Sequence, residues 1–123
     1  MSIPIYESSE NYLEAILMIK ERKGEVHSID IAEELNFTKA SVSVAMKKLR
    51  ENGFITMEKD GRIHLCEKGR VIAEKTYEKH KMLTDFFISI GVDAITAEDD
   101  ACKVEHDISD LTFEKLKKYI SEH

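Results

Sequence analysis

The stretch TKASVSVAMKKLRENGFITMEKDGRIHLC, residues 38–66, decides the fold. Thr38 belongs to the residue types that cap helices, and Gly53 to those that end them. Between them, apolar side chains recur at i, i+3, i+4 and i+7. This spacing predicts a helix that runs to Asn52 and turns its apolar residues toward a core. The apolar positions are Val42, Ala45, Met46 and Leu49.

A β-hairpin is predicted directly after this helix. Residues 54–58 and 62–66 alternate apolar and polar side chains, as strands with one buried face do. Lys59, Asp60 and Gly61 between them are typical of a tight turn. We therefore expect two antiparallel strands.

Two more helices are predicted before residue 38. Apolar residues recur at helical spacing over residues 8–22, and Gly24 follows as a stop signal. Ser28 is placed to cap a short helix over residues 29–35, and residues 36–37 supply a turn. Helix, helix, helix and hairpin is the element order of a winged helix-turn-helix.

The outer face of the helix over residues 38–52 predicts contact with DNA. Its side chains are small, hydroxylic or basic, so the face could approach base edges while its cations neutralise phosphates. The alternative is a solvated basic face, which is common on helices. The order of capped helices and hairpin favours double-stranded DNA. The predicted contacts are Thr38, Lys39, Ala40, Ser41, Ser43, Val44, Lys47, Lys48, Arg50, Lys59 and Arg62.

The charge of the chain is unevenly distributed. The formal net charge is −6 over 123 residues, which by itself argues against nucleic acid. Residues 38–50, however, carry basic side chains and no acid, whereas residues 93–110 are strongly acidic. The chain is also short for an enzyme with a separate substrate domain. We expect a basic module followed by an acidic one, and no catalytic activity.

Composition also bounds the location of the protein. Residues 1–6 lack the basic region and apolar run of a signal peptide, and no apolar stretch is long enough to span a membrane. We expect a cytoplasmic protein that does not bind membranes. In a reducing compartment, Cys66 and Cys102 are expected to be free thiols or metal ligands rather than a disulfide.

A cluster of metal-binding residue types follows. A long helix is predicted over residues 68–90, with His80 on its apolar stripe. The next helix is predicted to be capped by Thr96, with Asp99 returning the hydrogen bond. Its expected core stripe is Ala97, Ala101, Val104, Ile108 and Leu111.

Cys102, Glu105 and His106 stand at i, i+3 and i+4 beside that stripe, within an arc of about 100°. A thiolate, a carboxylate and an imidazole suit a borderline divalent transition metal rather than Ca²⁺ or Mg²⁺, which prefer oxygen alone. The alternative is an acidic solvated helix with one buried cysteine.

Further ligands could come from the first helix, where Asn11 and Glu14 stand at i and i+3. Their default interpretation is a solvated surface. If this face instead met the acidic helix, a bound metal would fix the angle between the DNA-reading module and the dimer core.

These residues resemble the diphtheria toxin repressor and manganese transport regulator family over nearly the whole chain. The most specific matching segment is residues 100–109, DACKVEHDIS. The others are residues 9–14, 31–35, 41–43, 53–55, 68–69, 79–80 and 90–93.

The resemblance implies a mostly α protein, with a winged helix-turn-helix DNA-binding domain followed by an all-helical metal-binding and dimerisation domain. We place these domains at residues 1–70 and 71–123. The implied metal ligands are Asn11, Glu14, His80, Cys102, Glu105 and His106, and the implied DNA contacts are Thr38, Ala40, Ser41 and Ser43.

The sequence departs from the family pattern at several positions. Asn11 stands where relatives usually carry Met or Asp, so this ligand is expected to be weakened or to be replaced by an amide oxygen. Thr84 and Glu98 argue against a second metal site of the iron type. Cys102 resembles the iron-responsive branch, whereas Glu14 and the short length resemble the manganese branch. We expect a slight preference for Fe²⁺ over Mn²⁺.

An amphipathic helix is expected over residues 112–120. Palindromic operators are read by two-fold symmetric proteins, so we predict a homodimer with apolar residues of this segment and of the long helix at its centre. The expected function is repression of metal-uptake genes, without a small-molecule substrate. The alternative function is a winged-helix regulator that senses a small organic ligand or oxidation of Cys102; a metal-dependent enzyme is a further alternative.

Overall fold

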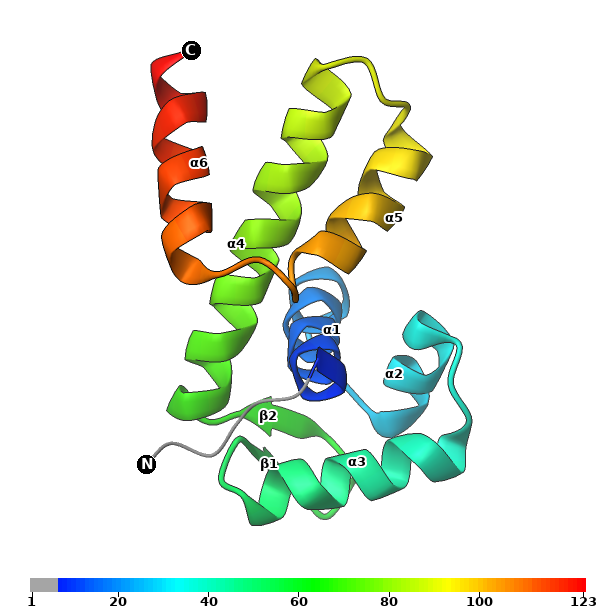
Figure 1. Ribbon diagram of the computed structural model, residues 1–123. Helices are drawn as coiled ribbons and strands as arrows, with labels where there is room; N and C mark the ends of the chain where they lie inside the picture. The colour runs from blue at the N-terminus through cyan, green and yellow to red at the C-terminus, as the bar shows by residue number, and fades with distance from the viewer. Residues whose placement is uncertain (1–6) are drawn as a thin grey trace. The chain divides into compact units, whose positions relative to one another are not determined.

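The computed structural model describes residues 7–123. The prediction that residues 1–6 do not begin a signal peptide therefore lies outside the described residues. The chain divides into two compact units, the first ending at Glu74 and the second running from Lys75 to His123. The predicted mostly α fold class is confirmed. The elements, labelled in Figure 1, are α1 (Glu7–Lys23), α2 (Ser28–Leu35), α3 (Lys39–Glu51), β1 (Ile55–Met57), β2 (Ile63–Leu65), α4 (Glu67–Ser89), α5 (Ala94–Val104) and α6 (Asp110–Glu122).

The start of each short helix in the first unit is fixed by a side chain. Thr38 caps α3, as predicted, and its hydroxyl accepts a hydrogen bond from the Ser41 N–H at 3.1 Å. The prediction that Ser28 caps α2 was wrong. The cap is His27, which has an extended backbone and whose N–H donates to the Asp30 carboxylate at 2.9 Å. An acid at the third helical position, rather than a hydroxyl at the cap, therefore satisfies this end.

The first unit is built around one apolar core. α1, α2, α3 and the hairpin all contribute to it, and Leu13, Ile31 and Val42 are completely buried. β1 and β2 pair antiparallel, with Ile55 opposite Leu65. The turn of the hairpin depends on Gly61, whose φ of +93° is a conformation that other residues rarely adopt. These contacts confirm the winged arrangement of three helices and a hairpin.

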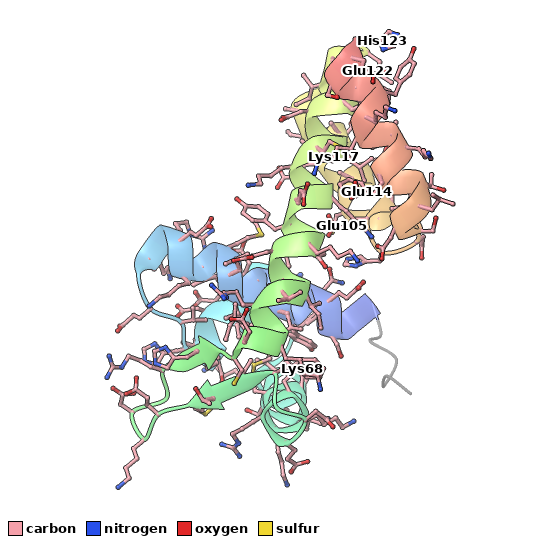
Figure 2. All side chains as sticks on the ribbon, turned by 90° about the vertical axis from the view of Figure 1, so that its left-hand side faces the viewer. Lys68, Glu105, Glu114, Lys117, Glu122 and His123 are labelled. Carbon is pink, nitrogen blue, oxygen red and sulfur yellow. The ribbon has the colours of Figure 1, made fainter. Side chains whose placement is uncertain are left out.

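The second unit consists of the end of α4 with α5 and α6, which Figure 1 shows on either side of it. Lys117 of α6, labelled in Figure 2, forms an ion pair with Glu78 of α4. Apolar contact is modest, and the most buried apolar side chains are Leu83, Ala97, Ala101 and Phe113. Within residues 7–123 no helix combines the length and apolar character needed to cross a membrane.

Two predictions for α5 were wrong. Its cap is Asp93, whose carboxylate accepts from the Thr96 N–H at 3.0 Å, so the helix starts earlier than a Thr96 cap would allow. It also ends at Val104, which leaves Ile108 and Leu111 outside it. A new helix, α6, begins instead at Asp110. Ser109 is its N-cap, and the Ser109 hydroxyl accepts a hydrogen bond from the Thr112 N–H at 3.2 Å. Leu111 is therefore not a core residue and is 69% exposed.

Replacing Gly69 with alanine should destabilise the protein. Alanine normally favours a helix over glycine by about 1 kcal/mol. A Cβ at residue 69 of α4, however, would lie 2.2 Å from the carbonyl oxygen of Phe54. We expect this overlap to reverse the sign, so that Gly69→Ala lowers the free energy of unfolding by about 1–3 kcal/mol in urea titrations. Glu74→Ala, at an exposed position of α4, is the control and should change it by less than about 0.5 kcal/mol. A more stable Gly69→Ala variant would contradict the close approach.

Candidate metal centre and nucleic-acid interface

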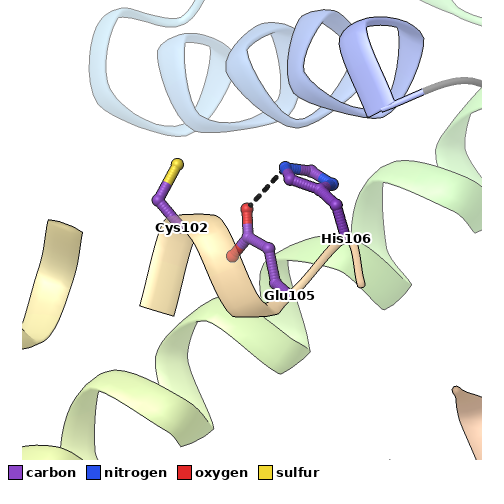
Figure 3. Close-up of side chains that lie close together, drawn as sticks. All are labelled: Cys102, Glu105 and His106. Atoms are coloured by element: carbon purple, nitrogen blue, oxygen red, sulfur yellow. Dashed lines mark ion pairs between the residues drawn. The ribbon is translucent and has the colours of Figure 1, made fainter. Parts of the chain in front are cut away.

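Three metal-binding side chains converge where α5 ends. Cys102 lies in the last turn of α5, Glu105 is its C-cap, and His106 lies in the turn beyond. Figure 3 shows the three side chains on the same side of this segment. One donor atom from each lies within 4.8 Å of the others. Two donors bonded at about 2.3 Å on opposite sides of one ion are roughly 4.6 Å apart, so the cluster is close to the size of a metal site.

Glu105 lies between two imidazoles. Its carboxylate is 2.9 Å from Nδ1 of His80, on α4, and 3.2 Å from Nε2 of His106. The side chain of Glu105 is completely buried, that of His106 is 1% exposed and that of His80 is 13% exposed. Buried ionisable groups are stable only when they are paired or bound to a metal. The second unit therefore gathers a thiol, a carboxylate and an imidazole at the end of α5. The imidazole of His80 pairs with the same carboxylate.

The chemistry of this donor set fits a divalent transition metal. Imidazole and thiolate are the ligand types that Fe²⁺, Co²⁺ and Zn²⁺ accept and that Ca²⁺ and Mg²⁺ do not favour. Cys102 is exposed and is a free cysteine. The cluster is therefore reachable from solvent at its sulfur end and closed at Glu105. The role of these residues as ligands remains a prediction.

The other predicted ligands lie on α1, in the first unit. Glu14 is 5% exposed, so the alternative interpretation of a solvated surface does not hold for it, while Asn11 is half-buried. A carboxylate is rarely buried without a functional or pairing role. That Asn11 and Glu14 bind a metal stays a prediction from the sequence.

Sequence reasoning did not predict that Glu98 would lie near His80. The Glu98 carboxylate is 3.9 Å from Nε2 of His80, on the opposite side of the ring from the nitrogen that faces Glu105. The spacing of Glu98 and Cys102, i and i+4 on α5, is the signal that could have indicated it. His80 thus lies between carboxylates of α5 and of the turn that follows.

The predicted DNA-reading face of α3 is exposed. Val42, Met46 and Leu49 are buried on the inner side, whereas Val44 is 56% exposed on the outer side. A large apolar residue so exposed on a helix of a reading head is suited to touch a thymine methyl group. The exposed outer-face residues are Lys39, Ala40, Ser41, Ser43, Val44, Lys47, Lys48 and Arg50.

The two residues of the hairpin that are predicted to contact phosphates, Lys59 and Arg62, differ in how accessible their charges are. Arg62 is held within the turn, because its Nε is 2.8 Å from the Asp60 carboxylate and 3.2 Å from that of Glu58. The backbone N–H and the guanidinium of Arg62 hold the pKa of Asp60 below its usual range. Lys59 is exposed at the turn. Lys59 is therefore better placed than Arg62 to meet a phosphate.

A winged head followed by a helical unit with a thiolate, carboxylate and imidazole cluster defines a class, the metal-dependent transcriptional regulators. Residues 5–63 match the description "Iron dependent repressor, N-terminal DNA binding domain". Residues 66–123 match "Iron dependent repressor, metal binding and dimerisation domain". The chain belongs to the iron dependent repressor family, as the sequence predicted. This family comprises DNA-binding, dimerising regulators that depend on iron or manganese.

Individual relatives agree with this assignment. The chain is 38% identical over 116 residues to an uncharacterized HTH-type transcriptional regulator of Methanocaldococcus jannaschii, covering 93% of each chain. It is 36% identical over 102 residues to the HTH-type transcriptional regulator MntR of Shouchella clausii, covering 83% of this chain and 71% of that one. The structure of the manganese regulator SloR matches with a TM-score of 0.81 and 28% identity, over 92% of this chain and 53% of SloR. The chain thus corresponds to about half the length of SloR.

Thr38 should contribute to stability through its cap. Thr38→Ala removes the acceptor for the Ser41 N–H, and we expect the free energy of unfolding to fall by about 1 kcal/mol. Thr38→Ser keeps the oxygen and should stay within about 0.5 kcal/mol of the unchanged protein. Chemical denaturation of the metal-free protein gives both values. Equal loss in the two variants would show that the methyl group, not the cap, matters at this position.

Proposed function

We propose that this chain is a metal-dependent repressor that binds a palindromic operator as a metal-loaded homodimer and controls metal-uptake genes. The observation that carries this proposal is the cluster of Cys102, Glu105 and His106, whose carboxylate also pairs with His80, in a chain that also has an exposed, capped α3. The proposed division is a DNA-binding domain over residues 1–70 and a sensor domain over residues 71–123.

The proposed ligands of the second unit are His80, Cys102, Glu105 and His106. A divalent cation supplies positive charge that these donors can share. The Glu105 carboxylate is paired with His80 and His106, so the groups that would bind the ion also hold the end of α5 to α4. We also propose Asn11 and Glu14 as ligands, because of their i, i+3 spacing and the family resemblance. A cation bound by both sets would set the angle between the two domains and so the spacing of two recognition helices.

The proposed metal is Fe²⁺, with a slight preference over Mn²⁺. The preference rests on Cys102, because a soft thiolate favours the later transition metals over Mn²⁺, which suits oxygen ligands. The proposed carboxylate ligands, Glu105 and Glu14, remain compatible with Mn²⁺.

The proposed DNA contacts combine base reading with phosphate binding. Small and hydroxylic side chains near the start of α3 would meet base edges, and cations would neutralise phosphates. Lys47 and Arg50 flank a small pocket that Ser28, Ser43, Met46 and Met57 complete, which suits a backbone phosphate. The proposed contacts are Thr38, Lys39, Ala40, Ser41, Ser43, Val44, Lys47, Lys48, Arg50, Lys59 and Arg62.

The proposed dimer interface lies in the second unit. Ile88 and Ile90 near the end of α4 are 43% and 63% exposed, Ile95 of α5 is 78% exposed, and Tyr119 of α6 is 56% exposed. We propose that these side chains, which come from three helices of the same unit, are covered by the partner, because large exposed apolar patches mark protein interaction sites. A second copy of the chain is the partner that a palindromic operator requires.

Operator binding should depend on metal. Fluorescence anisotropy on a palindromic operator from upstream of the protein's own gene, at one stated salt concentration, should show tight binding with Fe²⁺ under anaerobic conditions and with Mn²⁺, but not with chelator. Glu105→Ala and His106→Ala should lose the metal response, and Lys118→Ala on α6 is the control. Equal binding with and without metal would limit the proposal to DNA recognition. Regulation that survives both substitutions but responds to oxidation would favour the cysteine-sensing alternative.

Ile95→Glu should weaken the homodimer. A buried charge at an interface costs at least about 1.4 kcal/mol, or about tenfold in the dissociation constant. Sedimentation velocity over a concentration series would measure it, with and without metal. Lys118→Glu, on the exposed polar face of α6, is the control and should leave the constant within about twofold. A monomeric wild-type protein at micromolar concentration would exclude the proposed assembly.

A further inference from the structure

Lys79 of α4 is a buried lysine in the second unit. Only 8% of its surface is exposed. Its ammonium group donates to the carbonyl oxygen of Ile108 at 3.4 Å and to the Asp110 carboxylate at 3.3 Å. It also lies 5.7 Å from the centre of the Phe113 ring. Lysine is seldom buried, because the loss of hydration must be offset by such partners.

Asp110 receives two lysines of α4. Lys75 donates to one carboxylate oxygen at 2.6 Å and Lys79 to the other at 3.3 Å. These hydrogen bonds, that of Lys75 first, hold the pKa of Asp110 below its usual range, so the carboxylate is charged at neutral pH. Asp110 is also the first residue of α6, where a negative charge is favourable. Lys75 and Lys79 of α4 therefore hold the first residue of α6 in place through the Asp110 carboxylate.

The segment fastened in this way contains two proposed metal ligands. Glu105 and His106 lie between the end of α5 and the start of α6, and Ile108 follows His106 by two residues. On α4, Lys79 immediately precedes His80, which contacts Glu105. Consecutive residues of α4 thus hold the same turn at two points, one through an imidazole and one through an ammonium group.

We propose that Lys79 is a positioning residue for the metal centre: it holds the turn over residues 105–109 so that Glu105 faces both His80 and His106. This inference rests on the proposed function. Lys79 itself, as a cation, binds no metal. It acts on the ligands through the carbonyl oxygen of Ile108 and the carboxylate of Asp110. Lys75 shares only the Asp110 contact, so it provides a matched comparison.

The test is a Co²⁺ titration of the metal-free full chain, followed by visible absorption of the bound ion. Groups that orient metal ligands typically contribute about 10–100-fold to affinity. We expect Lys79→Met to weaken Co²⁺ binding by about that factor, and to change the ligand-field bands of the saturated protein. Lys75→Met should bind within about threefold of wild type and keep its spectrum.

The spectrum separates positioning from stability. A variant that is only less stable would still give the wild-type spectrum once it is saturated with Co²⁺, whereas a displaced turn would not. Wild-type affinity and spectrum in Lys79→Met would overturn the inference and leave the proposed function intact. Failure of the wild-type chain to bind Co²⁺ would overturn both.

A second variant covers the case in which Lys79→Met does not fold, as judged by circular dichroism. Asp110→Asn removes the charge partner of Lys79 at a position whose side chain is 63% exposed. It should weaken Co²⁺ binding more than Lys75→Met does, because it releases both lysines. Binding equal to that of Lys75→Met would count against Lys79.

Discussion

The second unit depends on how the chain leaves α5. Glu105 ends this helix with its carboxylate completely buried between His80 and His106. A buried carboxylate needs a nearby hydrogen-bonding or charged partner. Because His80 of α4 is one such partner, the position of the turn depends on the position of α4. The apolar contacts of this unit rest largely on alanines, Leu83 and Phe113. The buried contacts of Glu105 with His80 and His106 therefore add to the few apolar contacts that hold this unit together.

The first unit could be predicted almost completely because its signals are local. A period of 3.6, a threonine cap and glycines with positive φ define α1, α3 and the hairpin within a few residues of sequence each. The one error in its caps has a local cause. Ser28 and His27 are adjacent, and Asp30 decides which of them is the cap. Its carboxylate accepts a hydrogen bond from the N–H of His27, and the hydroxyl of Ser28 is not the cap.

The candidate site was predicted for a partly wrong reason. The i, i+3, i+4 spacing assumed one continuous helix, yet α5 ends at Val104. The side chains still converge, because Glu105 keeps a right-handed helical conformation, with φ −58° and ψ −26°. Periodicity could not reveal the partners across 25 to 31 residues, such as His80 with Glu105 or Lys79 with Asp110. Those pairings depend on how α4 packs, which no single helical pattern contains.

A turn held by ionisable groups has a property that a turn held by apolar contacts would lack. Its energy would change if a cation bound there, because the same carboxylate and imidazoles that pair with one another are the groups proposed to hold the ion. Replacing such buried pairs with apolar side chains often leaves a protein as stable or more so. Their presence here, in the pair of Glu105 with His80 and at the buried Lys79 that precedes His80, is thus poorly explained by stability. The ionisable groups are better explained if the conformation of the turn over residues 105–109 has to respond to a change in local charge.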